Sequence, residues 1–127
     1  MGKHTVLEPP WPWIAKLGFA AGILSGNTIH TCGLVAFDAD GQVIGSGDIG
    51  RQTHQVFENM KTILALGGAT MDDVVKITTF LPDMSLYKGF AQARAEAFPN
   101  GIPASTAVSA ALVLPELLVE IEAVAII

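Results

Sequence analysis

Cysteine and charge are both scarce in this sequence, and each shortage excludes a class of protein. A single cysteine, Cys32, rules out a disulfide within the chain, and no Cys/His spacing typical of a metal site is present. Only 15% of the residues are charged, against about 25% in an average domain. The net charge is −5 and the seven Lys and Arg residues form no cluster, so no nucleic-acid partner is expected.

Long apolar runs are missing as well. No stretch reaches the roughly 18 apolar residues of a membrane span, and the start lacks the apolar core of a signal peptide. We therefore expect a cytoplasmic protein with no membrane partner. The 127 residues make a single domain, 1–127, and half of them are hydrophobic, which suffices for a core. The shortage of charge suggests that part of the surface is hidden in a homo-oligomer.

The first residues are rich in proline and tryptophan. Residues 1–13 contain Pro9, Pro10 and Pro12, which exclude a regular helix or a central strand there. We treat residues 1–18 as an N-terminal extension of the domain. Trp11 and Trp13 are expected to cap the core or line an interface, with stacking on a ligand as the alternative.

Apolar periodicity gives the expected elements in the order ββ(β)αβαββ. They are strands 19–24 and 28–37, a short strand 42–44, helix 51–66, strand 74–81, helix 85–98, and strands 104–112 and 117–127. The first helix has one apolar stripe, which consists of Val56, Phe57, Met60, Ile63 and Leu64. The order predicts an α+β domain with two helices on one face of a mixed sheet. The other face, expected to be apolar, would need a symmetric partner as its cover.

Two carboxylates interrupt the last strand, LLVEIEAVAII. Glu120 and Glu122 share one of its faces because side chains alternate along a strand. Either they are solvated or satisfied glutamates at a sheet edge, or they lie in a cleft and need a partner, since an unpaired buried carboxylate is costly.

Several stretches together resemble the Rid (YjgF-like, RidA-type) family, over nearly the whole chain from Phe19 to Ala125. They are GNTIHTCG at 26–33, QVFENMK at 55–61, VKITTFL at 75–81, PAST at 103–106 and VEIEA at 119–123. The resemblance implies a chorismate-mutase-like α+β subunit in a homotrimer. Its three sheets would form a central β-barrel, and small-molecule clefts would lie between neighbouring subunits.

Many members of that family are deaminases that hydrolyse reactive enamines and imines. An arginine in their P-A-R-[ST] stretch binds the substrate carboxylate, and Ser105 stands at that position here. Arg51 and Arg94 fall on predicted helix surfaces and Lys76 in a central strand, so none is expected to replace the arginine. Loss of such a charged pair weakens binding by about 10- to 1,000-fold. We therefore expect an arginine-lacking subgroup with weak or absent 2-iminoacid activity and a neutral or less acidic ligand.

The resemblance also assigns the other candidate ligand-binding positions. Phe19 replaces a tyrosine, Cys32 a serine, Ala107 a cysteine and Ala91 an asparagine. Gly33 belongs to the same glycine-bounded stretch as Cys32. Tyr87 matches an aromatic lining position, and Glu120 matches the glutamate proposed to hold or activate water.

Glu120 is accordingly the candidate catalytic residue, as a general base or a water-positioning group. Cys32 is expected to be a small buried apolar residue; a contact with His30, two positions away on the same strand face, is the alternative that would make it a nucleophile. Ser105 has no evident base and is expected to contact a ligand through its hydroxyl.

Three functions remain open from the sequence. The first is hydrolysis of an enamine, an imine or a related metabolite in the inter-subunit cleft, with no cofactor. The second is a ligand-binding or regulatory trimer without turnover. The third, an endoribonuclease or translation-inhibitor activity attached by resemblance, is disfavoured by the acidic charge.

Overall fold

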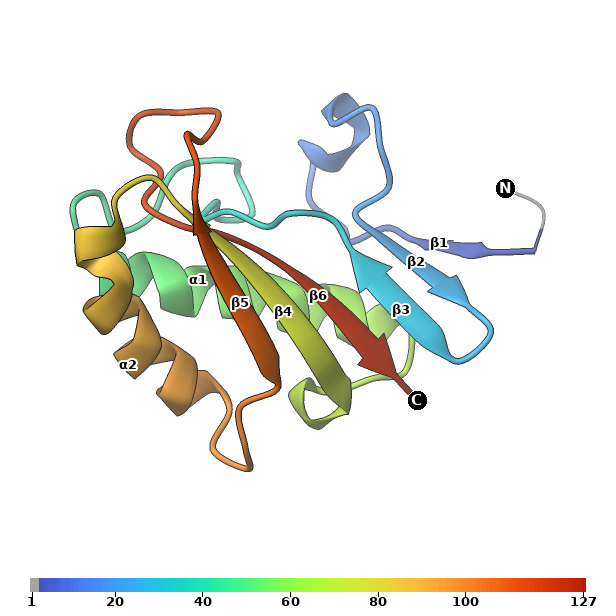
Figure 1. The fold of residues 1–127 in the computed structure, drawn as a ribbon. Helices are drawn as coiled ribbons and strands as arrows, with labels where there is room; N and C mark the ends of the chain where they lie inside the picture. Colours follow the sequence, from blue (N-terminus) through green and yellow to red (C-terminus); the bar gives the residue numbers. More distant parts are fainter. Residues whose placement is uncertain (1–2) are drawn as a thin grey trace.

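A mixed sheet of six strands runs through the computed structural model, which describes residues 3–127 (Figure 1). The strand order across the sheet is β1-β2-β3-β6-β4-β5. Neighbouring strands are antiparallel except for β4 and β5, which are parallel. The strands are β1 (Thr5–Leu7), β2 (Gly22–Ser25), β3 (Thr28–Thr31), β4 (Val74–Leu81), β5 (Ala104–Ser109) and β6 (Glu120–Ile126).

Two α-helices lie on the same face of this sheet, as Figure 1 shows: α1 (Ile49–Leu66) and α2 (Tyr87–Ala97). Helix α1 begins after Asp48, whose carboxylate accepts a hydrogen bond of 3.0 Å from the Arg51 amide. The predicted apolar stripe of this helix is fully buried against the sheet. Short 3-10 turns occur at Ile14–Lys16, Met71–Asp73 and Met84–Leu86. The α+β class and the two-helix layer are confirmed.

Strand boundaries differ from the predictions where turns compete with pairing. Strand β5 ends at Ser109 rather than Leu112, because its partner β4 ends at Leu81, just before a proline. Strand β6 begins at Glu120 rather than Leu117, since a turn from Leu114 to Leu117 occupies the preceding residues. Strand β3 likewise stops at Thr31, well short of the predicted residue 37.

The short strand predicted at residues 42–44 is absent, and Val43 makes only an isolated bridge with Phe37. The N-terminal extension contributes β1, which pairs with β2 at the edge of the sheet. Edge pairing is compatible with the nearby prolines, because an edge strand uses only one side of its backbone.

The sheet face opposite the helices is mixed rather than apolar. It carries His30, Lys76, Thr78 and Glu122 around a small depression of about 130 Å³. Lys76 donates a hydrogen bond of 2.6 Å to the Thr106 hydroxyl on β5. The sequence analysis expected this face to be apolar, and that expectation is wrong, since alternate positions of β4 and β6 are polar. Among the described residues, no helix is long and apolar enough to cross a membrane.

Gln52, on α1, connects the helical layer to the segment that leads into β6. Its side chain is fully buried, donates 2.9 Å to the Glu116 carbonyl and accepts 2.8 Å from the Leu118 amide. Both backbone groups would be left without partners if the amide were lost.

We predict that Gln52→Leu lowers the free energy of unfolding by about 2–4 kcal/mol, because each stranded backbone group costs about 1–3 kcal/mol. Urea denaturation at a fixed chain concentration measures the change. Glu58→Gln, on the exposed side of the same helix, is the matched control and should stay within about 0.5 kcal/mol. Equal stability of Gln52→Leu and the control would contradict this role of Gln52.

Candidate functional site

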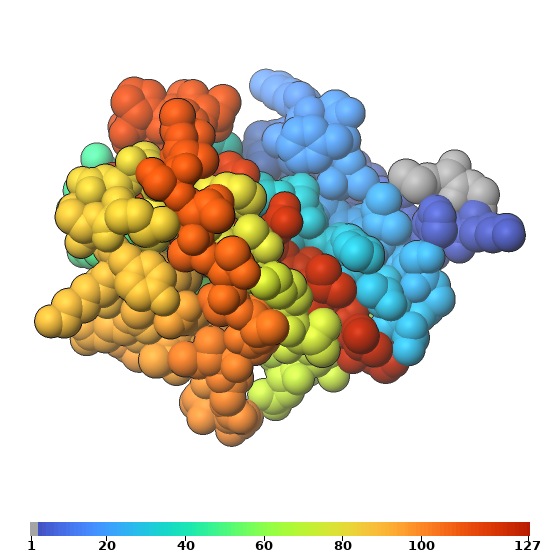
Figure 2. All heavy atoms as spheres, in the orientation of Figure 1, coloured from blue at the N-terminus to red at the C-terminus, as the bar shows by residue number. Residues whose placement is uncertain are grey.

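A cavity of about 320 Å³ lies at the end of the sheet where β6 begins. The surface is notched there between the orange-red loop after β5 and the blue N-terminal segment (Figure 2). Most of the lining is apolar and aromatic. The lining residues are Trp11, Trp13, Ile14, Leu17, Phe19, Ala21, Cys32, Gly33, Leu34, Val35, Phe37, Asn59, Val113 and Glu120.

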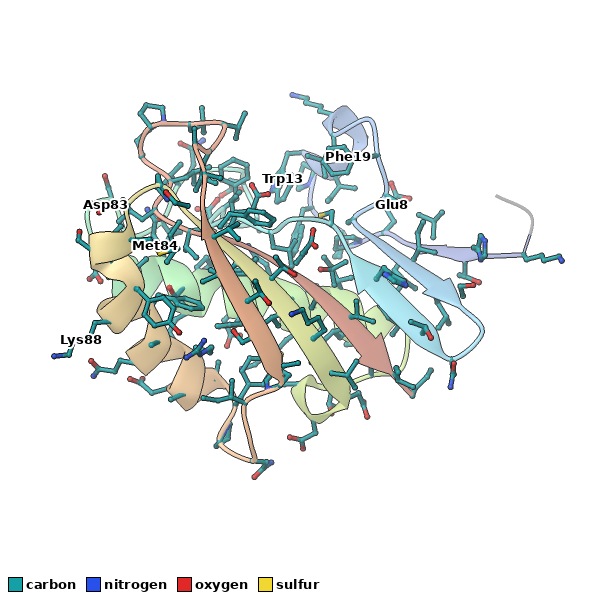
Figure 3. The ribbon with its side chains drawn as sticks, in the orientation of Figure 1. Glu8, Trp13, Phe19, Asp83, Met84 and Lys88 are labelled. Atoms are coloured by element: carbon teal, nitrogen blue, oxygen red, sulfur yellow. The ribbon has the colours of Figure 1, made fainter. Side chains whose placement is uncertain are left out.

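The two tryptophans form one wall of this cavity. Their rings are stacked with centroids 5.1 Å apart, and Trp13 packs edge-on against Phe37. The Trp13 indole donates a hydrogen bond of 3.1 Å to the Asp38 carbonyl, which fixes its orientation. Trp13 and the exposed Phe19 lie near each other, beyond the ends of the strands (Figure 3). The sequence left open whether the tryptophans cap the core or contact a ligand. In the structure these rings pack on the core and also face the cavity.

The cavity wall contains two ionisable residues, Glu120 and Cys32. Gly33, which also lines the cavity, leaves room for the Glu120 side chain. A Cβ atom at Gly33 would overlap Oε2 of Glu120, so a side chain at this position would displace the carboxylate. Burial raises the pKa of Glu120, and the nearby Glu122 carboxylate raises it further. The carboxylate is therefore held, half-buried, at a position where it can accept a proton.

Cys32 lies beside Glu120 but is poorly suited to act as a nucleophile. Burial, followed by the charge of Glu120, raises the pKa of its thiol to about 11. At neutral pH the residue is a thiol rather than the reactive thiolate. The alternative contact with His30 is not formed, because β3 ends at Thr31 and His30 lines the separate depression on the open sheet face.

Asn59 was not a candidate in the sequence, although it lies within the QVFENMK stretch. It is buried, donates to the carbonyls of Val35 and Phe37 at 3.1 and 2.9 Å, and accepts a hydrogen bond from Gln55. These bonds fix the loop that forms one side of the cavity. The sequence does contain a hint of this role, because Asn59 is a polar residue directly beside Met60, which belongs to the apolar stripe of α1.

The remaining candidates form a second group at the outer edge of the sheet. Ser105 and Ala107 lie on β5, and Tyr87 begins the neighbouring helix α2. Arg94 also belongs to this group, because its Nη1 donates a hydrogen bond of 2.9 Å to the Ser105 hydroxyl. Arg94 lies on a helix, as expected, but its guanidinium contacts Ser105, which its position in the sequence did not show. Helix α2 packs beside β5, so residues eleven positions apart in sequence meet.

The two groups lie on opposite faces of the sheet. Ser105 and Ala107 pair with Ile77 and Thr79, both fully buried toward the helices. Glu120 instead pairs with Phe80, whose side chain points the other way. In a single chain, Ser105 and Ala107 therefore do not face the cavity that is lined by Glu120, Phe19, Cys32 and Gly33. Within residues 3–127, no cluster of three His, Cys, Asp or Glu side chains is placed to hold a metal ion.

The raised pKa of Cys32 predicts slow alkylation of the folded protein at neutral pH, with a rate that rises toward pH 11. Iodoacetamide labelling followed by mass spectrometry measures this rate, and the single cysteine makes the product unambiguous. Glu120→Gln should speed labelling at pH 9, because removal of the negative charge lowers the pKa of the thiol. Denatured protein provides the reference for an ordinary thiol. Fast labelling of the native protein at pH 7 would contradict the assignment.

Comparisons with known proteins agree with this fold over most of the chain. The family model described as Endoribonuclease L-PSP matches residues 14–127. A RutC family protein of Pyrococcus horikoshii is 36% identical over 107 residues, which cover 84% of this chain and 85% of that protein.

Solved structures give the same result. A Rid-family protein of Yersinia pestis is similar with a TM-score of 0.89 at 27% identity, over 98% of this chain and 99% of that one. A member of the YjgF/YER057c/UK114 family from Mycobacterium tuberculosis has a TM-score of 0.85, again at 27% identity, over 98% and 99% of the two chains. The chain therefore belongs to the Endoribonuclease L-PSP family, together with the RutC, Rid and YjgF-like proteins.

Proposed function

We propose that this protein hydrolyses a small enamine or imine metabolite, with Glu120 as the group that activates the attacking water. The observation that carries the proposal is a carboxylate of raised pKa in the wall of an otherwise largely apolar cavity. A general base works best when its pKa approaches the working pH, and burial moves Glu120 in that direction. The cavity volume of about 320 Å³ suits a small metabolite.

The chemistry needs only water and a group that accepts and returns one proton. Glu120 takes a proton from water as the oxygen attacks the imine carbon, and returns it to the imine nitrogen to give a carbinolamine. Glu120 then moves the hydroxyl proton of the carbinolamine to the nitrogen as the C–N bond breaks, which releases ammonia and leaves the carbonyl of the product. An enamine reaches the same imine by protonation at carbon.

The complete site is assembled between copies of the chain in this proposal. Within one chain the cavity and the Tyr87–Ser105 edge lie on opposite sides of the sheet, so one copy alone cannot bring them together. Apolar side chains are exposed at both places: Phe19 is 60% and Val113 80% exposed near the cavity, and Tyr87 is 39% exposed at the edge. A homotrimer with inter-subunit clefts, as in the family resemblance, would cover them.

A ribonuclease activity is less well supported. The description of the matching family contains that activity, but this chain has a net charge of −5. Binding to an RNA backbone depends on Lys and Arg contacts with phosphates, and the seven basic residues of this chain are dispersed along it.

We predict that Glu120→Gln lowers the hydrolysis rate at least about 100-fold, the usual contribution of a general base. The substrate is an imine generated in place by an amino-acid oxidase, and ammonia release above the uncatalysed rate is measured. The rate of the wild-type protein should rise with pH through the raised pKa of Glu120, because the carboxylate form is the base.

Glu122→Gln is the matched control, on the same face of the same strand. It should keep the maximal rate but shift the rising part of the pH profile to lower pH, since Glu122 contributes to the raised pKa of Glu120. No turnover by the wild-type protein for any imine tested, together with ligand binding, would instead favour the regulatory trimer.

A further inference from the structure

Arg94 is a cation held in a defined position without an acidic partner. The ion pairs found among residues 3–127 join His54 to Glu96 and Lys61 to Glu58, and neither involves Arg94. Its Nε is buried and makes no hydrogen bond within the described part of the chain. One of its five N–H donors is used by Ser105, so donors remain for a further acceptor.

Aromatic rings and the serine fix the guanidinium in place. Its central carbon lies 5.7 Å from the ring centroid of Tyr87 and 5.2 Å from that of Phe90, distances typical of cation–π contacts. The hydrogen bond to Ser105 then holds it against β5. A guanidinium that is already oriented loses less freedom when it binds an anion than a mobile surface arginine would.

The residues around this guanidinium are small. Ala91 lies between Tyr87 and Arg94 on one stripe of α2, at the helical spacing i, i+4, i+7. Ser105 and Ala107 face it from β5. A long side chain that starts on α2 therefore reaches the strand position from which, in the family's P-A-R-[ST] pattern, an arginine would project.

On these observations, and resting on the proposed function, we infer that Arg94 is the anion-binding residue of this protein's cleft and that the ligand carries a carboxylate. The planar guanidinium matches a carboxylate with two parallel hydrogen bonds, and Ser105 positions it. This inference replaces the expectation, drawn from the sequence, that the cleft prefers a neutral ligand. The apolar cavity would take the side chain of the same ligand.

The direct test is calorimetric titration of the full-length protein with phenylpyruvate and, separately, with its methyl ester. The two probes have the same aromatic side chain and differ in the carboxylate charge. Arg94→Gln should weaken phenylpyruvate binding by about 10- to 100-fold, the loss expected for hydrogen bonds to a charged group, and leave ester binding within about twofold. Lys88→Gln removes the same charge from the exposed side of α2 and should change neither (Figure 3).

Three results would overturn the inference. They are equal phenylpyruvate affinity of wild type and Arg94→Gln, equal losses for acid and ester, and no binding of phenylpyruvate to the wild-type protein. Arg94→Lys decides the matter if Arg94→Gln fails to fold, since it keeps the charge but not the two-pronged geometry. We expect it to bind the acid at least about fivefold more weakly than wild type, with the ester unchanged.

Mixed assemblies test whether Arg94 and Glu120 meet across copies. Chains carrying Arg94→Gln and chains carrying Glu120→Gln are denatured together, refolded at equal amounts and assayed with the imine of phenylalanine. Random mixing gives about one quarter of the clefts both intact residues, so about a quarter of wild-type activity should return. Each variant refolded alone is the control. Absence of any gain over these controls would contradict a cleft shared by the two residues.

The inference and the proposed function can fail separately. Binding of phenylpyruvate needs no turnover, so Glu120→Gln should still bind it with Arg94 intact. Arg94-dependent binding without imine hydrolysis would remove the enzymatic function and leave the anion site. Imine hydrolysis that is unaffected by Arg94→Gln would remove the anion site and leave the enzymatic function.

Discussion

Much of this structure depends on a carboxylate kept partly out of water at the first residue of a central strand. Strand β6 lies between β3 and β4, and Glu120 itself pairs with Phe80 on β4. On the other side the backbone is held next to Glu120 by an isolated bridge between Leu34 and Ile121. Gly33 leaves the space that the carboxylate occupies, and the buried amide of Gln52 holds the segment that delivers it. Because transfer of a charge from water is costly, the carboxylate favours its protonated form more than an exposed one does.

The same constraint explains the state of the neighbouring thiol. Burial, followed by the negative charge of Glu120, keeps the pKa of the Cys32 thiol high, so attack by sulfur is disfavoured at neutral pH. Cys32 has a small side chain and Gly33 has none, while the aromatic residues Trp11, Trp13 and Phe19 of the N-terminal segment line the same cavity. The proline-rich start of the chain is thereby part of the site rather than an appendage to the domain.

Local sequence patterns predicted the helices and strands well where the apolar periodicity matches the observed strand pairing and helix packing. Helix α1 and strand β4 have the expected position and buried face. The strand pattern marked Glu120 and Glu122 together, and only the family resemblance singled out Glu120. Such local patterns could not predict which elements contact one another. Nothing in the spacing of Arg94 and Ser105 shows that α2 packs beside β5. Likewise, no local pattern shows that Trp11 and Trp13, in the segment between the paired strands β1 and β2, line the cavity. Strand ends were misplaced where prolines and buried amides redirect the backbone.

The stacked indoles have a practical consequence. Trp11 and Trp13 are the only tryptophans in the chain, and both line the cavity. The intrinsic fluorescence of the protein therefore arises almost entirely from the wall of the candidate site, where indole emission responds to local polarity and to contact quenching. A molecule that enters and displaces water changes the emission spectrum directly, so the chain contains its own optical reporter of occupancy and needs no attached dye.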